Sequence, residues 1–183
     1  MGVDLDVHDP GYEAYFDPES SVRVFDAALL EEPLSVLPTR SPLTFAPTDS
    51  VTDAMRAMQR HHRGCVLITE DGSQTTRLLG IFTERDVLLR IIDRGRNPAT
   101  LPLGEVMVED PESLPVDASV AWVLNKMSVG GFRHVPAVDH RGCPVDVVSV
   151  RDVVQFLVDA FPAAVLNLPP ECGAPRYQDR DGA

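Results

Sequence analysis

The chain has 183 residues, of which 44% are hydrophobic, and it carries a formal net charge of −12 at pH 7. This length is enough for one ordinary domain or for two small ones that share a core. The acidic balance disfavours nonspecific binding to nucleic acid or to an anionic membrane surface, and no apolar run approaches the roughly 18–20 residues that span a bilayer.

The two ends of the chain differ in composition from the middle. Residues 1–38 hold nine acidic residues, one arginine and four prolines, which predicts an acidic N-terminal extension. Within it, VRVFDAALL at 22–30 is apolar enough to dock on the body as a short helix. Residues 161–183 are rich in proline and polar side chains and are expected to form a C-terminal tail.

The region between these flanks contains an internal repeat. PTDSVTDAMRAM at 47–58 aligns with PVDASVAWVLNKM at 115–127, and both place apolar residues at the spacing of an amphipathic helix. Each helix is followed by a short apolar strand, 65–69 in one copy and 134–138 in the other, and then by a turn. The sequence therefore predicts two related units rather than one continuous domain.

Each unit continues with a second strand, at 77–83 and 145–149, that leads directly into a further helix. The predicted fold class is α/β (α+β), with two pseudo-symmetric β-α-β-β-α repeats that pack through their sheets. A unit of about fifty residues is too small to bury both faces of its sheet alone, which favours a shared core. The expected boundaries are residues 39–93 for the first repeat, 94–109 for a linker and 110–160 for the second repeat.

The second helix of each repeat is apolar around much of its circumference, over residues 87–92 and 153–158. Helices of this kind usually have neighbours on two sides. Trp122 points away from the apolar face of its own helix, which is typical of a contact with a linker or a partner subunit. We therefore expect a homodimer in which the second helices form the interface.

A short motif recurs where each second strand meets its helix. Thr83 and Asp86 in the first copy correspond to Ser149 and Asp152 in the second. A hydroxyl followed three residues later by a carboxylate fits a helix capping box. The first turn of the same helix also presents backbone N–H groups that favour a phosphate. The motif is therefore consistent with a helix cap, with a ligand contact, or with both.

The chain resembles a tandem pair of cystathionine-β-synthase (CBS) domains, a Bateman module. The resemblance rests on GIFTERDVLLRI at 80–91, FRHVPAVD at 132–139 and VVSVRDVVQFL at 147–157. It implies clefts between the repeats that take AMP, ADP, ATP or S-adenosylmethionine as regulatory ligands, with no obligatory cofactor. It also implies a set of ligand-contacting residues, namely Thr83, Arg85, Asp86, Arg133, His134, Ser149, Arg151 and Asp152.

By this resemblance the two aspartates accept hydrogen bonds from ribose hydroxyls, and the basic residues reach phosphate. The copies are unequal, because Asp146 replaces Gly80, and Gly64 stands where the second copy has Arg133. A carboxylate at Asp146 is expected to disfavour phosphate and to narrow its cleft. The sequence leaves open which cleft is filled.

The expected function is a stand-alone regulatory or sensor module that signals to an unknown protein target by a change of shape. The alternative is a ligand-free module for protein interaction or dimerisation. An enzyme is not expected, because no Gly-rich phosphate loop or catalytic carboxylate pair is visible. No metal cluster is expected either, and three widely spaced cysteines favour a reducing, cytoplasmic location.

Overall fold

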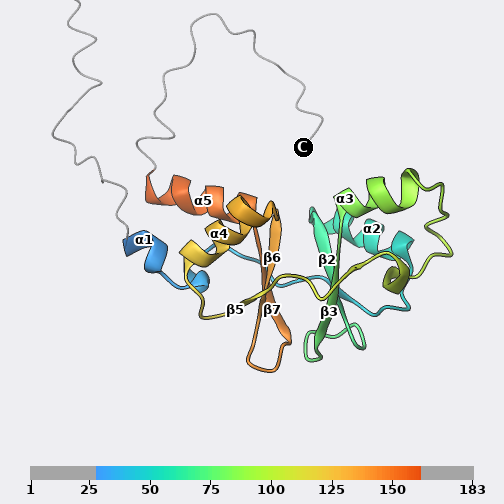
Figure 1. Ribbon diagram of the computed structural model, residues 1–183, viewed down its shortest axis with the longest axis horizontal. Helices are drawn as coiled ribbons and strands as arrows, with labels where there is room; N and C mark the ends of the chain where they lie inside the picture. Colours follow the sequence, from blue (N-terminus) through green and yellow to red (C-terminus); the bar gives the residue numbers. More distant parts are fainter. Residues whose placement is uncertain (1–27, 162–183) are drawn as a thin grey trace, which may run out of the picture.

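The computed structural model describes residues 28–161, which form two similar halves (Figure 1). Their sheets lie side by side in the middle, and the main helices lie on the outside. The first repeat comprises β1 (Thr44–Phe45), α2 (Val51–His61), β2 (Cys65–Thr69), β3 (Leu78–Thr83), α3 (Glu84–Asp86) and a π-helical turn at Val87–Ile92. The second comprises β5 (Leu114–Pro115), α4 (Val120–Gly130), β6 (His134–Val138), β7 (Pro144–Ser149) and α5 (Val150–Ala160).

The two repeats have the same strand pairing, which confirms the predicted pseudo-symmetric α/β fold. In the first, β1 pairs parallel with β2, and β2 pairs antiparallel with β3. In the second, β5, β6 and β7 pair in the same way. Even the irregularity is repeated, since the register shifts between Ile68 and Thr69 in one hairpin and between Ala137 and Val138 in the other.

Local signals set the ends of the first helix in each repeat. Ser50 caps α2 by accepting a hydrogen bond from the N–H of Asp53 at 3.1 Å. The chain leaves α2 at His62 and α4 at Gly131, both with positive φ, a conformation that glycine adopts without a steric cost. Among residues 28–161, no helix combines the length and apolar character needed to cross a membrane.

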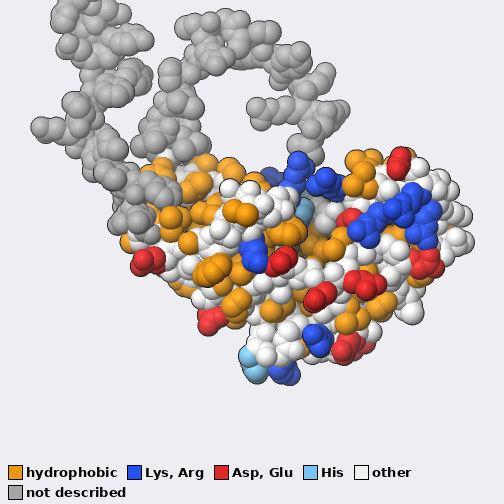
Figure 2. Space-filling view, viewed as in Figure 1, with side chains coloured by type: hydrophobic (Ala, Val, Ile, Leu, Met, Phe, Trp, Pro, Cys, Tyr) orange, Lys and Arg blue, Asp and Glu red, His pale blue; other side chains and the backbone are white. Residues whose placement is uncertain are grey.

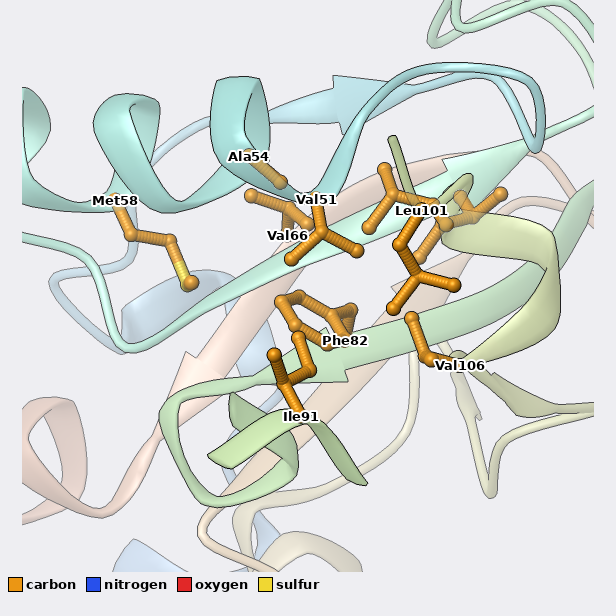
Figure 3. Packing of buried hydrophobic residues seen from close by; sticks show 10 residues of the cluster. Val51, Ala54, Met58, Val66, Phe82, Ile91, Leu101 and Val106 are labelled. Atoms are coloured by element: carbon orange, nitrogen blue, oxygen red, sulfur yellow. The ribbon is translucent and has the colours of Figure 1, made fainter. Parts of the chain in front are cut away.

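Each repeat has its own core, and a third cluster joins the two. The core of the first repeat packs α2 against β2 and β3 around Phe82 (Figure 3). Successive residues of β2 point to opposite faces, so Val66 and Ile68 enter this core while Cys65 and Leu67 face the other repeat. There they meet Val147 of β7, which confirms that the repeats pack through their sheets.

The segments that precede the repeats cross between them. β4 (Val108–Glu109), which follows a 3₁₀ turn at Leu103–Glu105, pairs with β3 of the first repeat before the chain enters the second. Arg40, which precedes β1, forms a β-bridge with Val147 of the second repeat.

The described end of the acidic extension packs on the second repeat. A short helix, α1 (Ala28–Glu31), contacts α4, and Leu34 and Leu37 are buried in the second core. The N–H of Leu34 donates to the carbonyl of Ala118 at 2.9 Å. The helix expected at 22–30 is therefore observed only where it overlaps α1, and residues 22–27 lie outside the described part of the chain.

Candidate functional site

A cavity of about 270 Å³ opens between the two repeats. This volume is close to the lower end of the range for small-molecule sites. Four segments line it: 40–43 before β1, 62–67 at the junction of α2 and β2, 133–134 at the start of β6, and 147–152 at the junction of β7 and α5. Because both repeats contribute to the lining, a molecule bound here contacts both.

The lining of the cavity is strongly basic, although the whole chain is acidic. Its charged and titratable members are Arg40, His62, Arg63, Arg133, His134, Arg151 and Asp152, together with the buried thiol of Cys65. Figure 2 shows basic side chains gathered at the upper middle of the molecule, between the helices of the two repeats. Four arginines around one carboxylate create a positive field that attracts an anion.

Among the described residues that line the cavity, Asp152 is the single carboxylate, and only one of its oxygens has a partner there. Oδ2 accepts from the N–H of Ser149 at 2.7 Å and from its hydroxyl at 2.6 Å. The Ser149 oxygen in turn accepts from the N–H of Asp152, which completes a capping box at the start of α5. Within residues 28–161, no group donates to Oδ1, so one carboxylate oxygen is available to a ligand.

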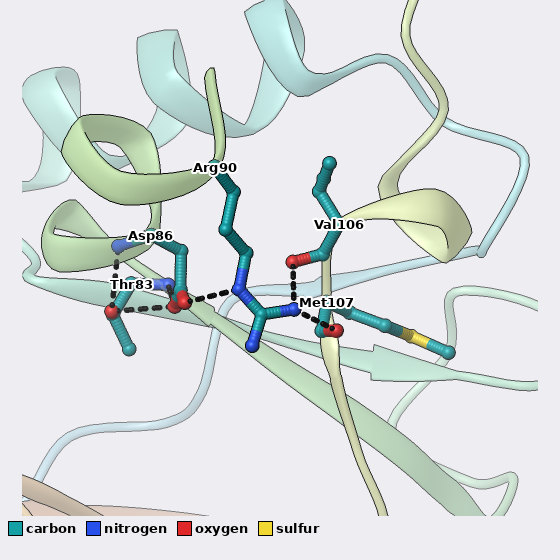
Figure 4. Close-up of polar contacts among 5 residues, drawn as sticks. All are labelled: Thr83, Asp86, Arg90, Val106 and Met107. Atoms are coloured by element: carbon teal, nitrogen blue, oxygen red, sulfur yellow. Dashed lines mark hydrogen bonds and ion pairs between the residues drawn. The ribbon is translucent and has the colours of Figure 1, made fainter. Parts of the chain in front are cut away.

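Asp86, at the corresponding position of the first repeat, is fully engaged by the protein (Figure 4). Its Oδ2 accepts from the N–H and hydroxyl of Thr83, at 2.9 and 2.7 Å. Its Oδ1 lies 3.1 Å from Nε of Arg90, whose Nη1 also donates to the carbonyl oxygens of Val106 and Met107. Asp86 therefore links its helix to the segment that leads into β4, and it does not line the cavity.

The difference between the two motifs arises from one position in each second helix. Arg90 follows Asp86 by four residues, a spacing that brings side chains together on a helix. The residue four positions after Asp152 is Phe156, which packs on the core of the second repeat and offers no cation. The Asp86–Arg90 spacing was therefore the sequence signal for this ion pair, and sequence reasoning missed it.

The glycine of the first motif also has a structural role. A Cβ at Gly80 would lie 2.4 Å from Sδ of Met107, so the absence of a side chain lets β4 pack against β3. Asp146, its counterpart, does not line the cavity. The carboxylate of Asp146 accepts from the hydroxyl of Thr39 and from the N–H of Val147. The expected narrowing of the cleft by Asp146 was therefore wrong, because this side chain is held on the sheet edge.

His134 lies at the wall of the cavity against Gly64. A Cβ at Gly64 would lie 2.8 Å from Nε2 of His134 and 3.7 Å from a carboxylate oxygen of Glu84. Burial lowers the pKa of His134 below its ordinary 6.5, while the charges of Glu84 and Asp152 act in the opposite direction and Arg133 adds to the lowering. Burial likewise raises the pKa of the neighbouring Cys65 thiol to about 12, so this cysteine is neutral and unsuited to nucleophilic attack.

Acidification from about pH 7.5 to about 5.5 is expected to lower the free energy of unfolding more in the wild type than in His134→Gln. Below pH 6.5 the unfolded chain binds a proton at His134 before the folded protein does, so stability falls as the pH drops through this window. Urea denaturation at several pH values measures the effect. His140→Gln changes an exposed histidine outside the cavity and should keep the wild-type slope. Equal slopes for the wild type and His134→Gln would contradict the prediction.

The structure brings together five of the eight site residues predicted from the sequence. Those that line the cavity are Arg133, His134, Ser149, Arg151 and Asp152. Thr83, Arg85 and Asp86 lie outside it. Sequence reasoning missed Arg40, which reaches the cavity only because its segment bridges to Val147 in the other repeat.

The start of α5 also contributes to the cavity through its backbone. The N–H of Val150 donates to the carbonyl of Arg133, and the N–H of Asp152 donates to the Ser149 hydroxyl. The N–H of Arg151 lies between them and has no acceptor within residues 28–161.

For metal binding, the described part of the chain contains no cluster of three or more His, Cys, Asp or Glu side chains.

Two like repeats that share a ligand-sized cleft define a tandem-repeat module. Residues 34–93 and 103–159 each match the CBS domain family, so the chain belongs to this family. Tandem CBS domains are regulatory modules.

Several known proteins are similar to the chain. It is 33% identical over 112 residues to a mitochondrial CBS domain-containing protein, CBSX3, of Arabidopsis thaliana, covering 60% of this chain and 53% of that one. The chain thus spans about half the length of that relative. It is 36% identical to a second relative from the same plant, CBSCBSPB1, over 61% of this chain and 19% of that one. Neither of these two relatives has the name of an enzyme.

The fold has close parallels among solved structures. An uncharacterised conserved protein from Pyrococcus horikoshii aligns with a TM-score of 0.62 at 24% identity, over 69% of this chain and 92% of that one. A CBS-domain containing protein from Agrobacterium tumefaciens aligns with a TM-score of 0.57 at 26% identity, over 64% of this chain and 85% of that one. A hexameric CBS-CP12 protein from cyanobacteria aligns at 19% identity with a TM-score of 0.57, over 67% and 66%, so oligomers occur among proteins of this fold.

Proposed function

We propose that the protein is a regulatory module that binds an adenosine-containing ligand, AMP, ADP, ATP or S-adenosylmethionine, in the cleft between its repeats. The observation that carries this proposal is Oδ1 of Asp152, which has no partner in the described part of the chain and lies among the arginines of the cavity. A carboxylate accepts hydrogen bonds from neighbouring ribose hydroxyls, and guanidinium groups pair with phosphate. The apolar walls, which include Leu43, Leu67 and Val147, suit a flat base.

In this proposal the ligand signals by changing how the two repeats sit against each other. A ligand shifts such an equilibrium only through different affinities for its two states. The walls of the cavity come from both repeats, so a movement of one repeat against the other changes the contacts that a bound ligand makes. Arg40 follows directly on the segment that carries Leu34 and Leu37 into the second core, so a change at the cleft is transmitted to the acidic extension for a protein target to recognise.

The first experiment is a thermal-shift screen of the full chain with adenosine, AMP, ADP, ATP and S-adenosylmethionine. A ligand that binds only the folded state raises its stability by about 2.7 kcal/mol at one hundred times Kd. We expect at least one member of the panel to raise the melting temperature and to be recovered chemically unchanged. The absence of any shift at millimolar concentration would contradict the proposed function.

We also propose that the protein forms a homodimer through its second helices. Apolar side chains on these helices are largely exposed, with Leu88 at 59%, Ile92 at 65% and Val154 at 53% of their full accessibility. Trp122 is also exposed, at 58%, as expected from its position on the helix. Exposed apolar clusters of this kind mark interaction surfaces on soluble proteins.

Light scattering of the wild type at micromolar concentration is expected to give twice the chain mass of 20.0 kDa. Ile92→Glu and Val154→Glu should give the monomer, because a buried, unpaired carboxylate at an interface is costly. Arg94→Glu changes an exposed residue near Ile92 and serves as the matched control. A monomeric wild type would contradict the proposed dimer.

The alternative function is a ligand-free module for protein interaction or dimerisation, which the same apolar surface favours. A stable dimer that shows no thermal shift with any adenosine ligand would support it over the sensor.

For location we propose the cytoplasm, since the buried Cys65 and Cys143 are free thiols that suit a reducing compartment. A fluorescent fusion that concentrated in an organelle would contradict this location.

A further inference from the structure

The charge of the cleft is larger than a single phosphate group requires. Arg40, Arg63, Arg133 and Arg151 line the same cavity, and Asp152 is the one carboxylate among its described lining residues. Arg63 donates to the backbone carbonyl of Ser41, which positions its guanidinium without neutralising it. Within residues 28–161, no carboxylate lies within ion-pair distance of these four arginines.

His134 is the titratable group at the centre of this lining. The charged or titratable groups around it come from four places. They are Glu84 on α3, Arg151 and Asp152 on α5, Arg133 just before its own strand, and Arg40, His62, Arg63 and Cys65 on the segments around β1 and β2. Burial keeps His134 neutral near neutral pH, because it lowers the pKa of this side chain. An anion that enters the cavity therefore lies beside a neutral histidine, which can still bind a proton.

We propose that the cleft selects a ligand with at least two phosphate groups and that His134 takes up a proton when this ligand binds. The inference rests on the proposed function and narrows its ligand class to a nucleoside di- or triphosphate. A phosphate chain distributes its charge over several guanidinium groups, each of which forms charge-assisted hydrogen bonds with it. Protonation of His134 adds one more donor and one more positive charge beside that chain.

The same reasoning disfavours two other ligands of the proposed class. A monophosphate carries less negative charge and fewer acceptor oxygens than a phosphate chain, so it forms fewer charge-assisted hydrogen bonds with the four arginines. S-adenosylmethionine carries a net positive charge, and its sulfonium group would lie among four arginines, which outnumber the two nearby carboxylates, Asp152 and Glu84. Like charges at such distances repel, and a partly enclosed cleft screens them less than water does.

The first test is isothermal titration calorimetry of the full chain with adenosine, AMP, ATP and S-adenosylmethionine at the same pH and salt. We expect ATP to bind at least about ten times more tightly than AMP or S-adenosylmethionine. Raising the salt concentration should weaken ATP binding and leave adenosine binding nearly unchanged. Arg133→Gln should reduce the preference for ATP over adenosine, because it removes a cation that only the phosphates meet.

The second test counts protons. Titrations with ATP in two buffers of different ionisation enthalpy give the number of protons bound with the ligand, and we expect net uptake near pH 7 by the wild type. Some of the measured proton uptake can come from a change in protonation of the nucleotide's own phosphates. His134→Gln should abolish the remaining uptake, which we assign to the protein. His140→Gln, an exposed histidine outside the cavity, should retain it. Urea denaturation of both variants verifies that they fold.

The possible outcomes separate this inference from the proposed function. Tighter binding of ATP together with proton uptake that depends on His134 supports the inference. Equal binding of AMP, S-adenosylmethionine and ATP, or proton uptake unchanged in a folded His134→Gln, overturns it while the proposed function stands. Failure of adenosine, AMP, ATP and S-adenosylmethionine all to bind overturns the proposed function itself.

Discussion

Asp152→Asn is expected to weaken the binding of adenosine and of ATP by about one to two orders of magnitude. Within residues 28–161, Asp152 is the only carboxylate that lines the cavity and its Oδ1 has no partner, and the substitution removes its charge. Hydrogen bonds to a charged group contribute about 1.5–3 kcal/mol, and each 1.4 kcal/mol is a factor of ten in Kd. Calorimetry on the folded variant measures this loss directly, independently of any change in melting temperature.

Asp86→Asn provides the matched control, because it makes the same chemical change at the corresponding position of the other repeat. Asp86 is 7% exposed, pairs with Arg90 and does not line the cavity. We therefore expect this variant to bind ATP with nearly wild-type affinity and to be less stable. The reverse result, with binding lost in Asp86→Asn and retained in Asp152→Asn, would show that the ligand occupies the other cleft.

Arg90→Met is expected to lower the free energy of unfolding by about 2 kcal/mol. The variant leaves the buried charge of Asp86 without its cation and removes the donor to the carbonyls of Val106 and Met107. Loss of one partner of a fully buried ion pair costs about 3–5 kcal/mol, and water screens part of this cost because the Arg90 side chain is 36% exposed. Urea denaturation at neutral pH measures the change.

Arg85→Met is the control for this variant, since Arg85 is an exposed neighbour that forms no ion pair within residues 28–161. Its effect should stay within about 0.5 kcal/mol, as for most surface substitutions. The double variant Asp86→Asn with Arg90→Met should lose less stability than the two single changes added together, because the two side chains contact each other. A strictly additive double variant would show that the ion pair contributes nothing.

Local patterns predicted most of the fold. The strands expected at 65–69 and 134–138 are observed with these limits, because each apolar run is bounded by turn residues. The two capping boxes are also present, since a hydroxyl and a carboxylate three residues apart meet across the first turn of a helix. The second helix of the first repeat is less regular than predicted, with a π-helical turn over Val87–Ile92 after a single α-helical turn.

The candidate site was less predictable from the sequence than the fold. Thr83 and Asp86 match the motif as well as Ser149 and Asp152 do, and yet they lie outside the cavity. The motif describes only the cap, whereas the availability of the carboxylate depends on the partner of its second oxygen. In the first repeat this partner is Arg90, which is itself held by carbonyls 16 and 17 residues away in the sequence.

The sequence by itself determined the repeat, its helices and strands and the capping boxes, because these depend on side chains close together along the chain. Five residues of the cavity were predicted from the family resemblance. Only the tertiary structure decided which motif faces a cavity. It brought Arg40 against Val147 of the opposite repeat, held Asp146 with Thr39, and placed Gly64 of one repeat against His134 of the other. These contacts join residues more than sixty positions apart, and no local periodicity encodes such a pairing.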